Sequence, residues 1–522
     1  MKIILTIALS LALTAASYAA DGDEKELHLH IQKGHCEDAA AQTRAFGDLK
    51  YNPPYVLHEG RVRVPIIMVD FPDRKFTFLK EQLYDLYMGQ HPVEERPVKA
   101  SNTAGYGYGS AQEYFFENSF GKLDFEFDFY GPYTLPRNHE YYGQNTGRTL
   151  ARVLDDAFPL IDDDINFAKY DNDGDSICEI VYFLYAGEGA QFSGNNDDNW
   201  AKCGTVINKH KTKDGIILNR VGVNNELLLP EGNVDLKDGR ALINGIGVFC
   251  HELSHGLGLP DLYYTSNSWP NWDNIGPEDW DLMDNGLNVR YGFWPMPYTA
   301  WERMIMGWIE AEELTNSQDV TVWPLNDEAG RGKAYVVRNP ANRDEFWTIE
   351  NIPDNGWYSG MYGVGKGIII MHIDYSDEKF KFYATPNSIY GKPRCTIIPA
   401  DGRVISSYYL NKKHPDGTKI TTSIYNDNLC GDPYPGSTGT TSLAAYHNYA
   451  GEEDLVNFMP ITDIRLNDDG SVSFHFRGDP TGISELHPED ADSPVYDLHG
   501  RRSGQMQRGR IYVRNGSVVT IK

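Results

Sequence analysis

The spacing of apolar and polar residues in the first part of the chain predicts strands that alternate with helices. Residues 62–69 (VRVPIIMV) form an apolar, β-branched run, and residues 122–129 alternate apolar and polar side chains as a half-buried strand does. Ser110 is a good N-cap for the helix that follows it. The expected strands are residues 62–69, 122–129 and 180–185, and the expected helices are 110–118 and 149–160. This order indicates an α/β arrangement.

The pattern changes to strands beyond about residue 310, after two more predicted helices. We therefore expect a β-rich region there, and after about residue 479 a Pro/Asp-rich linker with a small terminal strand-turn-strand. The two helices are expected at 244–256 and 297–309, the strands at 334–338, 346–352, 367–375 and 456–459, and a hairpin around 467–470. We expect five segments along the chain: an N-terminal leader (1–20), a polar segment (21–57), an α/β domain (58–312), a β-rich domain (313–478) and a linker with a small β-module (479–522).

The N-terminus carries the pattern of a secretory signal peptide. Lys2 is followed by an apolar run over residues 3–16 and then by small residues up to Ala20, where we expect cleavage. An uncleaved membrane anchor is the less favoured alternative, because the run is short and no later segment offers about eighteen apolar residues. We expect a secreted protein, extracellular, at the cell surface or in the periplasm. Residues 21–57 are polar and aperiodic, which favours a pro-segment or an N-terminal arm.

Charge and cysteine content narrow the classes of function. The formal charge is −27 and is spread along the chain, so nucleic acid and anionic membranes are unfavoured partners. Six cysteines permit disulfides in an exported chain, but spacing does not choose their pairing. Because none forms a C-x-x-C pair, any zinc chemistry should come from histidines.

The run H-E-L-S-H at residues 251–255 predicts a catalytic zinc site. On a helix, His251 and His255 share a face and can bind one metal ion, while Glu252 flanks that face as a general base. A catalytic zinc needs a third protein ligand and one open position. Gly258 can end the helix in a left-handed turn and bring Asp261 to the metal.

Two alternatives to this ligand set remain open. The third ligand could be a glutamate of a later segment, Glu278 or Glu302. The histidines could also satisfy only hydrogen bonds of the core, without a metal. Further along, Met283 lies in a Gly-terminated turn at 280–286, where a thioether can form an apolar floor beneath the histidines or simply fill the core.

These motifs together resemble the immune inhibitor A family of secreted bacterial metallopeptidases. The similarity spans roughly residues 60 to 478 and is most specific at the zinc run. The matching segments are 245–263 (GIGVFCHELSHGLGLPDLY), 280–283 (WDLM), 69–73 (VDFPD), 113–115 (EYF), 119–122 (SFGK), 170–175 (YDNDGD) and 431–436 (GDPYPG). The C-terminal half is small, so the large accessory domains of better-known members are not implied.

The resemblance implies an α/β metzincin-like zinc peptidase domain made as a zymogen, and we expect a β-sandwich-like C-terminal region after it. It implies His251, His255 and Asp261 as zinc ligands, Glu252 as the general base and Met283 as the Met-turn. We expect a monomeric endopeptidase that hydrolyses proteins or peptides through a zinc-bound water activated by Glu252. The alternative is a surface adhesion or glycan-binding protein with a structural metal site, against which the intact Glu252 argues.

An acidic loop predicts a second metal site. Asp171, Asp173, Asp175 and Glu179 occupy positions 1, 3, 5 and 9 of a loop that can wrap a calcium ion in oxygen ligands. Ser176 replaces the glycine of an EF-hand at the sixth position, and the twelfth lacks its glutamate. We favour calcium over a solvated Asp-rich turn.

Two cysteines and the chain end have open interpretations. Cys36, in the expected pro-segment, forms a disulfide or, less favoured, offers a thiolate to the zinc. Cys250 points away from His251 on the helix and suits core packing or a disulfide. The last forty residues resemble short C-terminal β-modules of exported Bacteroidetes proteins, and either a sorting signal or a β-cap fits them.

Overall fold

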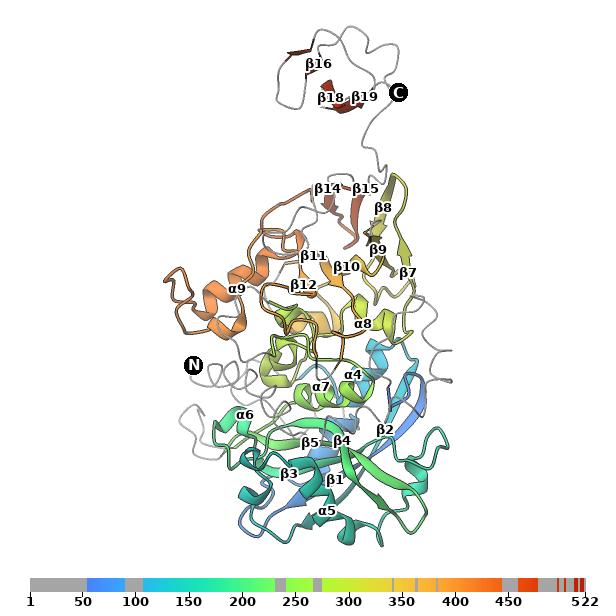
Figure 1. The fold of residues 1–522 in the computed structure, drawn as a ribbon, viewed down its shortest axis with the longest axis vertical. Coiled ribbons are helices and arrows are strands. Elements are labelled where there is room, and N and C mark those ends of the chain that lie inside the picture. The colour runs from blue at the N-terminus through green and yellow to red at the C-terminus, as the bar shows by residue number, and fades with distance from the viewer. Residues whose placement is uncertain are drawn as a thin grey trace.

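The computed structural model describes most of the chain from residue 54 onward (Figure 1). The described residues are 54–89, 107–230, 241–265, 275–339, 342–361, 365–381, 384–443 and 459–476, and the short strands at 495–496, 502–503, 511–514 and 517–520. The predicted signal peptide, the predicted pro-segment as far as residue 53 and Cys36 lie outside them. No helix in these ranges is long and apolar enough to cross a membrane.

A six-stranded mixed sheet forms the first region, in the order β2-β1-β3-β5-β4 with β6 also paired to β5. β1 runs parallel to β2 and β3, and β3 runs parallel to β5, whereas β4 and β6 lie antiparallel to β5. Both faces of β1 and β3 are buried, which explains their continuous apolar runs. The strands are β1 Gly60–Asp70, β2 Leu123–Thr134, β3 Val181–Glu188, β4 Lys202–Lys211, β5 Ile217–Leu229 and β6 Leu242–Ile243.

Helices cover both faces of this sheet (Figure 1). Alternate β1 residues enter different cores: Ile67 packs into the cluster that holds α5 (Thr149–Ile161), and Met68 packs into the cluster on the opposite face. The helices of that opposite face are α3 Lys80–Met88, α4 Ala111–Asn118 and α7 Ile246–Gly256. α4 begins at Ser110, whose hydroxyl accepts from the Glu113 amide as the sequence predicted.

A second region contains a six-stranded and a three-stranded sheet, in the orders β12-β11-β10-β9-β7, with β13 on β11, and β14-β15-β8. In β10 Phe346 joins the core shared with α7, whereas its neighbour Trp347 joins a core shared with the three-stranded sheet. The larger sheet is therefore buried on both faces. The strands are β7 Ala311–Glu313, β8 Gln318–Val322, β9 Ala334–Arg338, β10 Glu345–Ile352, β11 Gly367–Asp374, β12 Cys395–Ile397, β13 Tyr434–Pro435, β14 Ile461–Leu466 and β15 Val472–Phe476, and the longer helix is α9 Thr422–Gly431.

Predicted elements differ from the structure mainly at their ends. The helix predicted at 297–309 is only α8, Ala300–Ile305, because Thr299 is its extended N-cap and Gly307, with φ of 72°, follows its end. Residues 456–458 of one predicted strand are outside the described ranges. The predicted terminal strand-turn-strand corresponds to β18 (Ile511–Arg514) and β19 (Ser517–Thr520), which pair antiparallel in a four-stranded sheet with β16 (Val495–Tyr496) and β17 (Arg502–Ser503).

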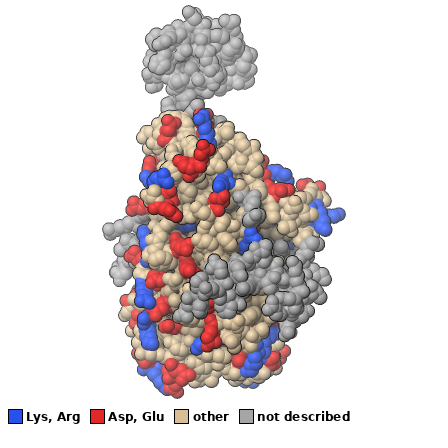
Figure 2. All heavy atoms as spheres, turned by 180° about the vertical axis from the view of Figure 1, so that it is seen from behind, with Lys and Arg blue, Asp and Glu red and all other residues tan. Residues whose placement is uncertain are grey.

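On the face drawn in Figure 2, charge is spread out, as it is along the sequence. Figure 2 shows acidic side chains scattered among basic ones over the visible face, without one large patch of a single sign. Cys250 is a free cysteine, fully buried in the core with α7, so of the two roles expected for it, packing or a disulfide, the structure shows packing.

Candidate metal centre

The helix that carries the histidines is held deep in the protein by close backbone packing. α7 is buried along almost its whole length. A Cβ atom on Gly247 would collide with the carbonyl of Leu287, so only glycine lets the helix approach the 3-10 segment Asn285–Gly292 this closely. α7 ends at Gly256, and Gly258 adopts a φ of 96°, the left-handed conformation predicted for the turn toward Asp261.

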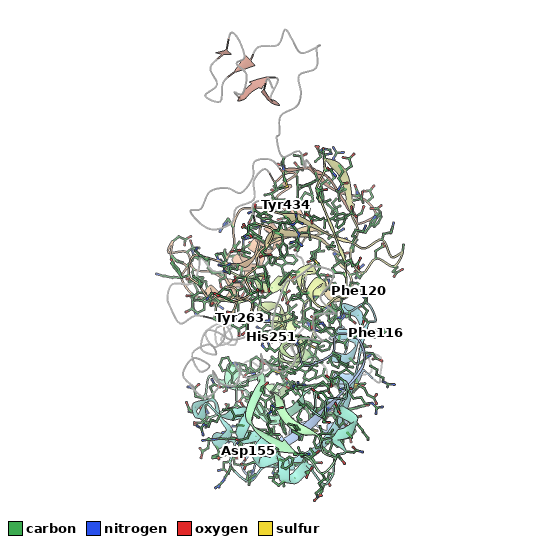
Figure 3. The ribbon with its side chains drawn as sticks, turned by 45° about the vertical axis from the view of Figure 1, so that its right-hand side comes forward. Phe116, Phe120, Asp155, His251, Tyr263 and Tyr434 are labelled. Carbon is green, nitrogen blue, oxygen red and sulfur yellow. The ribbon has the colours of Figure 1, made fainter. Side chains whose placement is uncertain are left out.

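The structure brings the three predicted zinc ligands together. The Nε2 atom of His251 lies 3.1 Å from Oδ1 of Asp261, and the Nε2 atom of His255 lies 3.5 Å from the same oxygen. One ligand atom from each residue lies within 4.8 Å of the others. His251 is labelled in Figure 3, in the middle of the molecule between the first sheet and the second region.

These distances fit a tetrahedral zinc ion. Ligand atoms at about 2.0–2.1 Å from such an ion are about 3.3–3.4 Å apart, close to the two separations observed. Neither alternative third ligand belongs to the group: Glu278 accepts from the Ser407 amide, and Glu302 accepts from the Thr299 amide at the start of α8. Of the three candidates, Asp261 is the one placed beside the histidines.

Backbone carbonyls orient both imidazole rings. Nδ1 of His251 lies 3.1 Å from the carbonyl oxygen of Leu282, and Nδ1 of His255 lies 2.8 Å from that of Leu259. When Nδ1 donates its proton to a carbonyl, Nε2 keeps a lone pair for a metal. Sequence reasoning missed both partners, because a backbone carbonyl leaves no signal in the residue types.

The electrostatics of the site follow from burial and the charge on Asp261. Burial acts to lower the pKa of His251, but the hydrogen bond and the charge of Asp261 outweigh it and raise that pKa to about 9. Burial raises the pKa of Glu252 to about 8, and Asp261 adds to this while His251 and Lys202 oppose it. The pKa of the Glu252 carboxyl group is thus raised from its usual value toward neutral pH.

Met283 lies in the turn that supports His251. Its side chain is fully buried, and its carbonyl oxygen accepts a hydrogen bond from the amide of Leu262 at 2.9 Å. Asp281 shapes the turn, since its carboxylate accepts from the Met283 amide at 2.6 Å and its carbonyl accepts from the Gly286 amide at 3.0 Å. The turn therefore contacts both His251, through Leu282, and the segment that carries Asp261.

Tyr263 lies beside the histidines and is one of three tyrosines, with Tyr264 and Tyr291, among which the sequence does not choose a site residue. Its ring lies 6.4 Å from that of His251, nearly parallel to it, and the two are labelled side by side in Figure 3. Burial acts to raise the pKa of Asp261, but the charges of His255 and His251 and hydrogen bonds from His251 and, least of these, Tyr263 hold it below its usual value. Its position two residues after the ligand was the only available signal.

The acidic loop brings three of its four predicted ligands together. Asp171, Asp173 and Glu179 each offer an oxygen within 4.8 Å of the others. Asp175 does not belong to this group: its carboxylate accepts from the Ile177 amide at 2.7 Å. Oδ1 of Asp171 is buried without a hydrogen-bond partner, and burial raises the pKa of Glu179 to about 7. A group of three carboxylates, one of which has a buried oxygen without a hydrogen-bond partner, suits a hard cation.

The chain is similar to a protein of Arthroderma benhamiae named "Putative secreted metallopeptidase", to which it is 22% identical over 303 residues. The match covers 48% of this chain and 41% of the relative, so the chain spans less than half of the relative's length. No protein-family model matches the chain.

Proposed function

We propose that this protein is a secreted zinc-dependent endopeptidase. The observation that carries the proposal is the convergence of His251, His255 and Asp261 beside the buried Glu252. Three protein ligands with an adjacent carboxylate are what a hydrolytic zinc site requires, whereas a structural site is closed by four ligands and has no need of a base. The name of the fungal relative supports the same activity and an extracellular location.

The chain's own residues have distinct roles in this proposal. His251, His255 and Asp261 hold the ion, which when bound supplies a Lewis acid that polarises the scissile carbonyl and acidifies water. Glu252, buried beside the ligands, accepts the proton of the attacking water and delivers it to the leaving amine.

The family assignment is part of the proposal. The zinc run, the left-handed turn at Gly258 and the buried Met283 support a metzincin-like peptidase of the immune inhibitor A type. A β-sandwich-like C-terminal region is supported by two sheets that share one hydrophobic cluster. The proposed zymogen form depends on residues 21–57, most of which are outside the described ranges.

We also propose a calcium ion at the acidic loop, with Asp171, Asp173 and Glu179 as ligands. Ser176, the residue at the glycine position of an EF-hand, adopts the left-handed conformation with φ of 66°. The loop thus makes the sharp turn that wraps a cation, although its twelfth position lacks the usual glutamate.

The decisive experiment compares hydrolysis of an unfolded protein by the purified mature chain, with and without a zinc chelator, with hydrolysis by Glu252→Gln. We expect cleavage that the chelator abolishes and that zinc restores. The variant should bind zinc like the wild type and lose cleavage by a factor of about 10²–10⁴, the usual contribution of a general base. Stoichiometric zinc without cleavage by any processed form would instead favour the adhesion or glycan-binding alternative.

A further inference from the structure

The segment that follows Asp261 touches the second region of the protein. The side-chain amide Nδ2 of Asn387 donates to the carbonyl of Leu262 at 2.6 Å, across 125 positions of sequence. Three residues further on, the hydroxyls of Thr265 and Thr385 are hydrogen-bonded at 2.5 Å. Residues 262 and 265 thus each meet a residue of the segment that leads into β12.

Asn387 is itself rigidly held. Its side chain is fully buried, and besides Leu262 it bonds Cys395 twice: Nδ2 donates to the Cys395 carbonyl at 2.7 Å, and Oδ1 accepts from the Cys395 amide at 3.0 Å. Cys395 begins β12, which pairs with the buried strand β11. The amide therefore links the Leu262 carbonyl to the larger sheet of the second region.

Leu262 is held from its other side by the Met283 turn. Its amide donates to the Met283 carbonyl at 2.9 Å, and the preceding carbonyl, that of Leu282, faces Nδ1 of His251 at 3.1 Å. The residue directly after Asp261 is therefore fixed between Met283 and Asn387. Metal ligands need such support, because an error of about half an ångström in a ligand position costs affinity.

We infer that Asn387, assisted by Thr385, is a positioning residue for the metal ligand Asp261, so that the second region supports the metal centre. This inference rests on the metal site of the proposed function. Asn387 does not touch the metal ligands; it acts by fixing the peptide that follows Asp261. Without it the buried Leu262 carbonyl loses a partner, and the turn that presents Asp261 can relax.

A matched control exists in the same region. Asn351 of β10 is also buried, and its Nδ2 also donates to two backbone carbonyls, those of Val322 and Gly470, at 2.9 Å each. These contacts join β10 to the three-stranded sheet. Removing this side chain should destabilise the second region in the same way without affecting the Asp261 segment.

The test compares Asn387→Ala with Asn351→Ala in the full chain, using Co²⁺ and Zn²⁺ as probes. We expect Asn387→Ala to weaken Zn²⁺ binding about 10–100-fold in competition with a chromophoric chelator, as outer-shell changes do, and to alter the visible d–d bands of bound Co²⁺. Asn351→Ala should lower Tm but keep the wild-type Zn²⁺ affinity and Co²⁺ spectrum. A folded Asn387→Ala with wild-type affinity and spectrum would overturn the inference.

If Asn387→Ala does not fold, the variant Thr385→Val tests the inference instead. It removes one hydroxyl from the contact with Thr265 and keeps the volume of the side chain. We expect a smaller change in the same direction, and unchanged Zn²⁺ affinity and Co²⁺ spectrum would refute the inference. Because both readouts are independent of hydrolysis, a wild-type chain that binds metal but cleaves nothing removes the peptidase proposal only.

Discussion

His251 and Asp261 are ten residues apart in sequence, yet the Nε2 atom of His251 lies 3.1 Å from the Oδ1 atom of Asp261. The turn at Gly258 brings the two together, and His255 completes the group at 3.5 Å. Each of the three side chains therefore presents a ligand atom to the same point.

Replacing Asp261 by alanine should remove one of the three proposed zinc ligands. We expect a loss of zinc affinity greater than the ~10–100-fold typical of changes in the outer shell, measured by chelator competition. Asp155→Ala is a suitable control, because Asp155 pairs with His210 away from the metal centre. Wild-type affinity in Asp261→Ala would return Glu278 or Glu302 to consideration as the third ligand.

Calcium should stabilise the folded chain through the acidic loop. Ligand at a hundred times its Kd adds about 2.7 kcal/mol to the free energy of unfolding, so Tm should rise on calcium addition. Asp171→Asn should abolish this rise, because Asp171 supplies the orphaned oxygen, whereas Asp175→Asn should largely retain it. The idea fails if calcium shifts the Tm of the wild type and of Asp171→Asn equally.

Residues 55–58 should stabilise α7, the helix that carries His251 and His255. The amides of Tyr55 and Val56 both donate to the carbonyl of Gly256 at the end of α7, at 3.0 and 2.9 Å, and Val56 is buried. A chain beginning at residue 59 should unfold more easily than one beginning at 54, by about 1.5–3 kcal/mol for the apolar side chain alone. Denaturant titration of the two chains measures this difference. Equal midpoints would show that maturation can remove the whole predicted pro-segment, 21–57, without cost to the helix.

His58 should make folding stability depend on pH. Its Nε2 lies 2.7 Å from the carbonyl of Leu257, and burial lowers its pKa below the usual 6.5. Because the unfolded chain then binds the proton more readily, this contribution is complete above pH 6.5 and falls as the pH falls below it. His58→Gln keeps an N–H donor but does not titrate, so the wild type minus variant difference in unfolding free energy should shrink between pH 7 and pH 5. A difference that stays constant would contradict a neutral buried His58.

The sequence alone determined the features that local backbone geometry fixes. The four-residue spacing of His251 and His255 places both on one helix face, and Gly258 permits the left-handed turn to Asp261. The acidic loop follows the same logic only in part, since Asp175 turned to the Ile177 amide instead of joining the other carboxylates. In each case the residues concerned are close together in sequence, and a short backbone segment can adopt few conformations.

Only the tertiary structure decided which distant groups complete the site. The Leu282 carbonyl lies 31 positions from His251, and Asn387 lies 125 positions from Leu262. Such contacts depend on how separate segments pack. Because a backbone carbonyl has the same chemistry in every residue type, no pattern of side chains predicts which carbonyl will orient a histidine. The proposed ligands could therefore be identified from the sequence. The groups that hold them in place could be identified only from the way the two regions pack around α7.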